Sequence, residues 1–400
     1  MAPFSKCFER NSTDSTCGTS VCSNDAAHTH ESTTSGGDDH AVPVTICDPE
    51  SFPAPHLGSC KWVRSHSSFV YDPVADAKYE ASNVLISHES EYGYWLRGTI
   101  RRALFGKVVH AHVLRRREIP DEDCIWEATG SQCAVKLLSW SKIRNNEANK
   151  QTLEDPLKEI AAMQYIKRHP DASRNVLTPV EVISDSKHIY VIMPFCKDGE
   201  LYDRLERSND SFHEGEARYW FQQILQGIQS LHQAGVCHRD LSLENVLIHG
   251  GSCHIIDMGM SLRTPSKKPS SSCGSSPILM PPQGTCGKFF YMAPEIYDNR
   301  EAFDGFAIDV WSAGAMLFMM LTGAPAFERP TASDPCFDWI MNGRLSEMLD
   351  AWNKKLSPEA VNLLEGMLSV NTNSRLTLDQ VMKHPWVTGE HDVPPPPCAQ

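Results

Sequence analysis

The feature that most constrains this chain is an ordered set of polar residues that interrupts apolar sequence in its second half. The run 238–241 reads His-Arg-Asp-Leu and is followed by Asn245, and Asp257 begins an Asp-Met-Gly run twelve residues further on. Carboxylate and amide oxygens bind hard divalent cations, and a carboxylate can also accept a proton. Asp240, Asn245 and Asp257 are therefore candidate catalytic and metal-binding residues.

Further motifs frame this set in a fixed order. Upstream, an Ala-Val-Lys run ends at Lys136 within the apolar stretch 133–138, which has the pattern of a strand. Downstream, an Ala-Pro-Glu run ends at Glu295, and an Asp-Val-Trp-Ser-x-Gly run begins at Asp309. Each run alone is a weak signal, but their ordered coincidence is strong.

Together these motifs resemble those of the eukaryotic protein kinase domain over about residues 92–387, and the His-Pro-Trp run at 384–386 is most similar to the calcium/calmodulin-dependent branch of Ser/Thr kinases. The resemblance implies an α+β, two-lobed protein kinase fold, with a β-rich N-lobe that carries one main helix and a mostly α-helical C-lobe. It also implies ATP and Mg²⁺ as cofactors and transfer of the γ-phosphoryl group to serine or threonine of protein substrates. A pseudokinase that keeps the fold as an interaction scaffold is the alternative.

The resemblance gives the central polar residues their roles. Asp240 would be the catalytic base, and Asn245 and Asp257 would hold two magnesium ions. Asp309 would brace the catalytic loop from below.

Two ion pairs are also implied. Lys136 would bind the α- and β-phosphates and pair with an acid on the first helix of the domain. Glu159 is the expected acid, and Glu154 is the alternative. Glu295 would pair with Arg375 and anchor the end of the activation segment.

The implied nucleotide site lies at the junction of the lobes. The run 191–196 matches the hinge, with Met193 at the gatekeeper position and the backbone of Pro194 and Cys196 facing adenine. Proline lacks only the N–H, so the carbonyl contact is kept. Glu200 matches the acid that reaches the ribose. The expected nucleotide-binding residues are Lys136, Glu159, Gly106, Val108, Ala134, Met193, Pro194, Cys196, Glu200 and Leu247.

Two departures from the family pattern concern glycine and apolar positions. The glycine-rich loop reads Arg-Arg-Ala-Leu-Phe-Gly over 101–106, so only Gly106 of the three glycines is present. Other residues resist the backbone shape that closes on phosphates by roughly 1 kcal/mol each. Met258 replaces the phenylalanine after the metal-binding aspartate, and this adaptable side chain should fill the same space, with Met163 and Val180 stacked above it.

Two more departures face each other in the family arrangement. Ser242 stands where Ser/Thr kinases have a lysine, and Lys288 stands where they have a threonine. In the family these two side chains touch each other and the catalytic aspartate. We therefore expect an exchange in which Lys288 supplies the ammonium and Ser242 the hydroxyl, so that both act as catalytic residues. The alternative is a solvated Lys288 and a weakened site.

The sequence gives weaker indications of how the protein is regulated and which substrates it prefers. The segment between Asp257 and Glu295 holds serines at 270–272 and 275–276, and Arg239 is typical of kinases in which a loop phosphate pairs with an arginine. Glu200 and Glu244 match acids that read an arginine two or three residues before the acceptor hydroxyl, so we expect basic-directed protein substrates.

Composition divides the chain into three parts. Residues 1–88 are rich in Ser, Thr and Asp, and we expect an N-terminal extension without fixed structure. The kinase domain is expected over 89–387 and a Pro-rich tail over 388–400. Within the domain, the predicted N-lobe is 89–193, the hinge 194–199 and the C-lobe 200–387.

Charge and hydropathy exclude some classes of partner. A net charge of −13 over 400 residues argues against a nucleic-acid partner. The most apolar stretch, 306–321, contains Asp309 and is short for a bilayer span, so no membrane partner is expected. The 14 cysteines are scattered, as in a reduced intracellular protein. We expect a cytoplasmic location, with the nucleus as the alternative.

Overall fold

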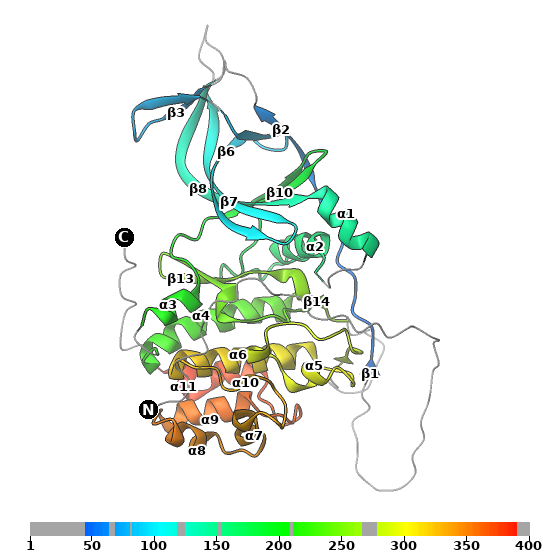
Figure 1. Cartoon of the computed structure of the whole chain (residues 1–400), viewed down its shortest axis with the longest axis vertical. Helices are drawn as coiled ribbons and strands as arrows, with labels where there is room; N and C mark the ends of the chain where they lie inside the picture. Colours follow the sequence, from blue (N-terminus) through cyan, green and yellow to red (C-terminus); the bar gives the residue numbers. More distant parts are fainter. Residues whose placement is uncertain are drawn as a thin grey trace.

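The computed structural model describes residues 45–63, 69–80, 82–117, 125–149, 154–208, 211–265 and 278–389. Most strands lie in an upper N-lobe and most helices in a lower C-lobe (Figure 1). The α+β, two-lobed architecture expected from the sequence is therefore confirmed.

Within the described residues the N-lobe is one nine-stranded sheet in the order β10-β9-β2-β5-β6-β7-β8-β3-β4, and a further pairing of β10 with β8 closes it on itself. Its enclosed core contains Tyr94, Val135 and Tyr190. The strands are β2 Gly58–Val63, β3 Phe69–Asp72, β4 Ala77–Glu80, β5 Val84–Ser87, β6 Tyr92–Ala103, β7 Gly106–Arg117, β8 Ile125–Ser139, β9 Glu181–Ser184 and β10 His188–Pro194.

The expectation that residues 1–88 lack fixed structure is wrong for the described part of that segment. Strands β2 to β5 belong to the N-lobe sheet, and Val70, Val84 and Leu85 on them are fully buried. The strands are short and are separated by polar stretches, so the average composition hid their apolar positions. Residues 1–44 lie outside the described residues.

Two helices accompany the N-lobe sheet, α1 Trp140–Asn149 and α2 Pro156–Lys167. Helix α2 carries Glu159, the acid expected to pair with Lys136. Asp155 caps it by accepting hydrogen bonds from the amides of Leu157 and Lys158, and Pro156 occupies its first turn, where the missing N–H costs nothing.

The C-lobe packs around helices α4 and α6, which contribute Trp220, Phe221 and Trp311 to its core. Its helices are α3 Leu201–Glu206, α4 Glu214–Gln233, α5 Pro294–Asp298, α6 Gly305–Thr322, α7 Pro335–Met341, α8 Leu345–Ala351, α9 Pro358–Met367, α10 Leu378–Lys383 and α11 Pro385–Thr388. Its short strands are β11 Val236–Cys237, β12 Val246–His249, β13 Ser252–Ile255, β14 Leu262–Arg263 and β15 Ile278–Leu279; β15 pairs with β1 Thr45–Ile46.

Helix α6 is apolar on nearly every side because it is the central helix of the C-lobe. Asp304 caps its start and Gly323, at φ 78°, ends it. It is the one helix of the described residues long and apolar enough to cross a membrane, and 89% of the tested window is buried inside the protein. Its composition is therefore that of a core helix.

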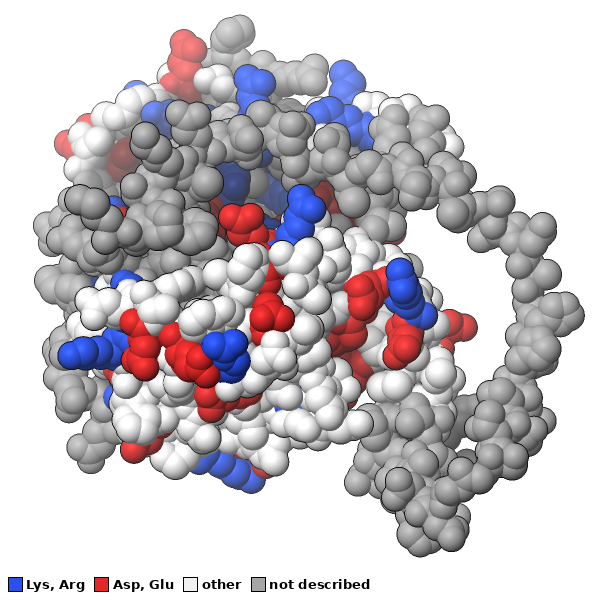
Figure 2. Space-filling model, turned by 60° about the horizontal axis from the view of Figure 1, so that its bottom comes forward, with Lys and Arg blue, Asp and Glu red and all other residues white. Residues whose placement is uncertain are grey.

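The outer helices of the C-lobe are polar on their exposed side. Figure 2 brings the lower end of the molecule forward and shows acidic side chains gathered on it. Helices α8 to α10 contribute the exposed acids Glu347, Asp350, Glu359, Glu365 and Asp379. The excess of acidic charge in the sequence thus lies in part on this surface.

Candidate active site

Lys136 and Glu159 form an ion pair inside the N-lobe. Lys136 Nζ on β8 lies 2.6 and 2.7 Å from the two carboxylate oxygens of Glu159 on α2. Burial lowers the pKa of Lys136, but the carboxylates of Glu159 and Asp257 outweigh that effect, and the net pKa lies above the usual value. Glu159, rather than the alternative Glu154, is therefore the partner of this lysine.

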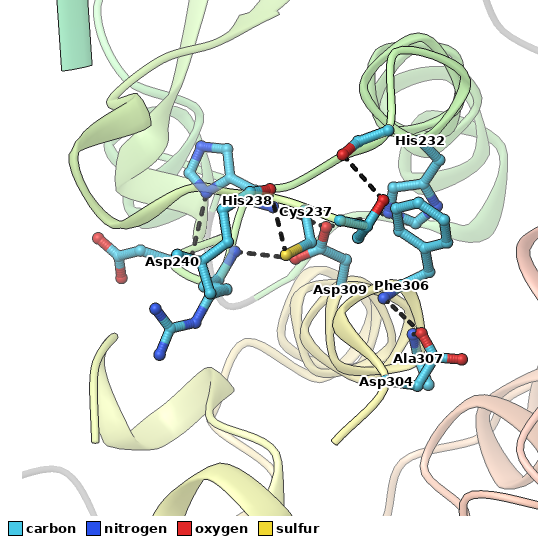
Figure 3. A network of polar contacts seen from close by, with 12 residues as sticks. His232, Cys237, His238, Asp240, Asp304, Phe306, Ala307 and Asp309 are labelled. Carbon is cyan, nitrogen blue, oxygen red and sulfur yellow. Dashed lines mark hydrogen bonds and ion pairs between the residues drawn. The ribbon is translucent and has the colours of Figure 1, made fainter. Parts of the chain in front are cut away.

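The catalytic loop is held by Asp309, which is fully buried on α6. Its carboxylate accepts hydrogen bonds from the backbone N–H groups of His238 at 2.8 Å and Arg239 at 2.9 Å, and His232 Nε2 lies 3.0 Å away (Figure 3). These contacts hold Arg239 at φ 68°, a conformation that costs a non-glycine residue about 1–3 kcal/mol. Asp309 therefore braces the loop, as the sequence predicts.

Asp240 is oriented by Asn245. The amide nitrogen of Asn245 donates to the backbone carbonyl of Asp240 at 2.8 Å and to its Oδ2 at 2.9 Å. The other carboxylate oxygen, Oδ1, is buried and has no hydrogen-bond partner among the described residues. Burial raises the pKa of Asp240, although Lys288 and His238 act in the opposite direction. One carboxylate oxygen is thus positioned by the protein and the other is left to accept a proton.

Lys288 and Ser242 meet beside Asp240. Lys288 Nζ lies 2.7 Å from Ser242 Oγ, and Ser242 is fully buried. Gly287, at φ 92°, lets the chain approach closely, because an added Cβ would lie 3.0 Å from the carbonyl oxygen of Arg239 and 3.4 Å from Asp240 Oδ1. The structure thus brings together the two residues that depart from the family pattern.

Asp257 follows strand β13 at φ 70°, in the left-handed region, and its carboxylate accepts a hydrogen bond from Gly259 N at 3.2 Å. It acts electrostatically on both Lys136 and Asp240, so it lies near both. Residues 258–260 are beside α2, with Met258 fully buried and Met163 nearly so. Val180, expected above Met258, is 55% exposed, so that part of the prediction is wrong.

Asp257 and Asn245 fit a magnesium site. Among the described residues no cluster of three or more His, Cys, Asp or Glu side chains surrounds a metal position. Mg²⁺ is commonly held by one or two carboxylates together with substrate phosphates, so a complete protein cage is not required. The amide nitrogen of Asn245 is committed to Asp240, which leaves its oxygen as the atom able to bind a cation.

Gly106 is present for a reason that the sequence did not reveal. An added Cβ at Gly106 would lie 1.8 Å from the carbonyl oxygen of Leu137 on β8. This glycine is therefore required where strands β7 and β8 pack. Strand register also places Val108 opposite Lys136 and Met193 opposite Ala134.

The expected hinge residues lie where β10 ends. Pro194 is exposed, Cys196 is half-buried, and Leu247 is bridged to Glu200. The acid expected to reach the ribose has a partner in the opposite lobe, since Arg101 Nη1 on β6 lies 2.6 Å from Glu200 Oε1. Burial raises the pKa of Glu200, and the Arg101 guanidinium acts in the opposite direction. The sequence did not predict this contact between the lobes.

The end of the activation segment is anchored as predicted. Arg375 Nη1 and Nη2 lie 2.6 and 3.1 Å from the two oxygens of Glu295. Nearby, Arg239 donates to the carbonyl oxygens of Gly284 at 3.1 Å and Met260 at 3.4 Å. The serines at 270–272 and 275–276 lie outside the described residues, so phosphorylation there stays a prediction.

These elements define the class to which the chain belongs. A protein-family model described as "Protein kinase domain" matches residues 122–387, and the chain is a member of that family. The match begins after the strands that carry the altered glycine-rich loop.

Curated relatives are Ser/Thr kinases. Over 277 residues the chain is 32% identical to calcium-dependent protein kinase 24 of Arabidopsis thaliana, covering 68% of this chain and 43% of the relative. It is 33% identical over 247 residues to serine/threonine-protein kinase SRK2G of the same plant, covering 57% and 66%. It is 31% identical over 283 residues to CBL-interacting serine/threonine-protein kinase 15, also from Arabidopsis thaliana, covering 70% and 58%. The matches thus span between about two fifths and two thirds of these relatives' lengths, and they agree with the predicted branch.

Proposed function

We propose that this chain is an ATP-dependent serine/threonine protein kinase. The observation that carries the proposal is the contact of Lys288 with Ser242 beside Asp240. A missing lysine two residues after the base is the departure that most favours a scaffold, and the contact supplies an ammonium at that place from another segment. Lys136, Asp257 and Asn245 complete the expected set.

The protein's own residues would divide the work as follows. Asp257 and Asn245 would hold magnesium, which would supply charge neutralisation at the phosphates. Lys136, fixed by Glu159, would orient the α- and β-phosphates. Asp240 would accept the proton of the substrate hydroxyl, and Lys288 would stabilise charge on the transferring group.

The direct test is phosphoryl transfer by the purified full chain. We expect it to label serine and threonine peptides from a peptide library when labelled ATP and Mg²⁺ are supplied. Absence of transfer to any peptide, with Mg-ATP still bound, would favour the scaffold alternative.

We expect Asp257→Asn to remove most of the stabilisation by Mg-ATP. Asparagine tolerates the left-handed backbone at this position, so the substitution removes a carboxylate ligand without added strain. Ligand at about 100 times Kd adds about 2.7 kcal/mol of stability, which a thermal-shift assay detects. Asp379→Asn, on the exposed face of α10, is the matched control. A wild-type Mg-ATP shift in Asp257→Asn would contradict the metal role.

We also propose basic-directed substrates read by Glu200 and Glu244. Glu200 already binds a guanidinium, that of Arg101, which supports the pairing chemistry and makes Arg101 an internal competitor. Because the Arg101 side chain is 68% exposed, its pair contributes about 0–1 kcal/mol.

We therefore expect Arg101→Ala to raise the preference for arginine before the acceptor by up to about fivefold. A peptide array scored by kcat/KM measures the change, with Arg102→Ala as the control. Unchanged or reduced arginine preference in Arg101→Ala would contradict the competition.

A further inference from the structure

One segment that the sequence analysis placed outside the kinase domain connects three parts of it. Residues 45–63, hereafter the strap, run from the activation segment, past α2, to the N-lobe sheet, as the blue chain between β1 and β2 in Figure 1 shows. Every residue of the strap is described, so its contacts can be followed from one end to the other.

The lower end of the strap pairs with the activation segment. Thr45 and Ile46 form β1, which is parallel to Ile278 and Leu279 of β15. Cys47 N extends the pairing by donating to the carbonyl oxygen of Leu279 at 2.9 Å. On its other side this part of the activation segment is tied to the C-lobe, because Met280 and Phe303 exchange backbone hydrogen bonds of 2.8 and 2.9 Å.

The next part of the strap binds Arg263, which follows Asp257 by six residues. Glu50 N donates to the carbonyl oxygen of Arg263 at 2.9 Å, and the Glu50 carboxylate pairs with Arg263 Nη2 at 2.8 Å. Arg263 Nη1 donates to the carbonyl oxygen of Ser51 at 3.2 Å. Strand β14, which contains Arg263, pairs with β11 directly before the catalytic loop. The contacts of the strap with Arg263 therefore fix the first part of the activation segment beside that loop.

The middle of the strap contacts two successive residues of α2. Phe52 packs edge-on against Tyr165 with ring centroids 5.8 Å apart, and the Arg263 guanidinium lies 4.9 Å from the same ring. Gln164 forms a reciprocal pair with the backbone of His56: its Oε1 accepts from His56 N and its Nε2 donates to His56 O, both at 2.8 Å. The Gln164 side chain thus contacts the backbone of the strap and not one of its side chains.

The upper end of the strap joins the N-lobe sheet. Gly58 and Ser59 pair in parallel with β9, and Trp62 Nε1 donates to the hydroxyl of Tyr190 at 3.0 Å. Between the α2 contacts lie Pro53 and Pro55, whose fixed φ stiffens the chain. A stiff segment fixed at both ends restricts the movement of the helix between them.

We propose that the strap is a built-in positioning element for the kinase reaction. It holds α2 where Glu159 meets Lys136, and it holds the activation segment against the catalytic loop. The positioning residues are Glu50, Phe52 and Gln164, none of which touches a reacting group. The catalytic consequence rests on the proposed function, whereas the effect on α2 does not.

The test uses the full chain with Phe52→Ala, Gln164→Ala and the double variant. Alanine favours helix, so Gln164→Ala removes the strap contact without weakening α2 itself. We expect faster amide hydrogen exchange over residues 156–167 in the variants, measured against wild type. We also expect kcat to fall about tenfold in the double variant, with a smaller change in KM for the peptide.

A charge exchange tests the ion pair between Glu50 and Arg263. Glu50→Ala should lower kcat, and Glu50→Arg combined with Arg263→Glu should recover activity relative to either single change. Trp352→Ala is the control for general destabilisation, because Trp352 meets Phe318 with the same 5.8 Å edge-on geometry far from the site. It should lower the melting temperature and leave exchange over 156–167 unchanged.

Two results would overturn the proposal. One is wild-type hydrogen exchange of α2 in the folded double variant. The other is equal loosening of α2 in Trp352→Ala, which would make the effect nonspecific. If the wild-type chain itself transfers no phosphoryl group, the proposed function fails, and hydrogen exchange alone still decides whether the strap holds α2.

Discussion

Asp240→Asn is expected to lower kcat by about 10²–10⁴-fold and to leave the fold intact. The substituted amide has the same shape and can still accept the hydrogen bond that Asn245 gives to Oδ2. It cannot accept a proton at the position of Oδ1, the buried oxygen that has no partner among the described residues. The loss should therefore fall on the chemical step, measured as kcat with saturating Mg-ATP and peptide.

The control for this prediction is the same exchange at a surface carboxylate. Asp379 lies on α10, and its one ion pair among the described residues is with exposed Lys383, so Asp379→Asn should keep wild-type kcat. Circular dichroism and the Mg-ATP thermal shift should be similar for both variants and wild type. Wild-type turnover in Asp240→Asn would show that another group accepts the proton.

The residues of the catalytic centre could be predicted because each motif is local. The spacing of Asp240 and Asn245 sets one tight loop, so their hydrogen bond follows from a few neighbouring residues. The Lys136–Glu159 pair was also predictable, because the family resemblance placed the acid on a helix that follows the strand of the lysine, and α2 is that helix. Elements that are close in the sequence usually lie side by side in space, so few other arrangements of these residues are possible.

Long-range contacts were harder to predict. Arg263 and Ser51 are 212 residues apart in the chain, and no pattern in either segment indicates the other. Many contacts of the strap are backbone hydrogen bonds, which any sequence can form. The strap also lies in an extension rich in Ser, Thr and Asp, so the average composition of that extension predicted no fixed structure. Both Arg101 and Glu200 were identified in the sequence. Their ion pair, however, depends on how the two lobes lie relative to each other.

We expect kcat to depend strongly on Lys288, a residue that departs from the family pattern. Its ammonium lies 2.7 Å from Ser242 Oγ and is one of the groups that lower the pKa of Asp240 against the effect of burial. A cation at this place should stabilise charge on the transferring phosphoryl group, so Lys288→Thr should lower kcat by about 10²-fold or more. Without it the pKa of Asp240 should rise, and the acidic limb of kcat/KM should move to higher pH.

A double-mutant cycle separates this role from a structural one. Ser242→Lys with Lys288→Thr rebuilds the arrangement usual in the family and should recover much of the activity lost in Lys288→Thr. Ser242→Lys alone should not help, because it places two cations side by side in a buried position next to Asp240. Strong positive coupling in kcat between the two positions is therefore expected. Simple addition of the two effects, or a harmless Lys288→Thr, would mean that the Lys288 ammonium does not act on the transferring group and that phosphoryl transfer relies on Lys136 and magnesium alone.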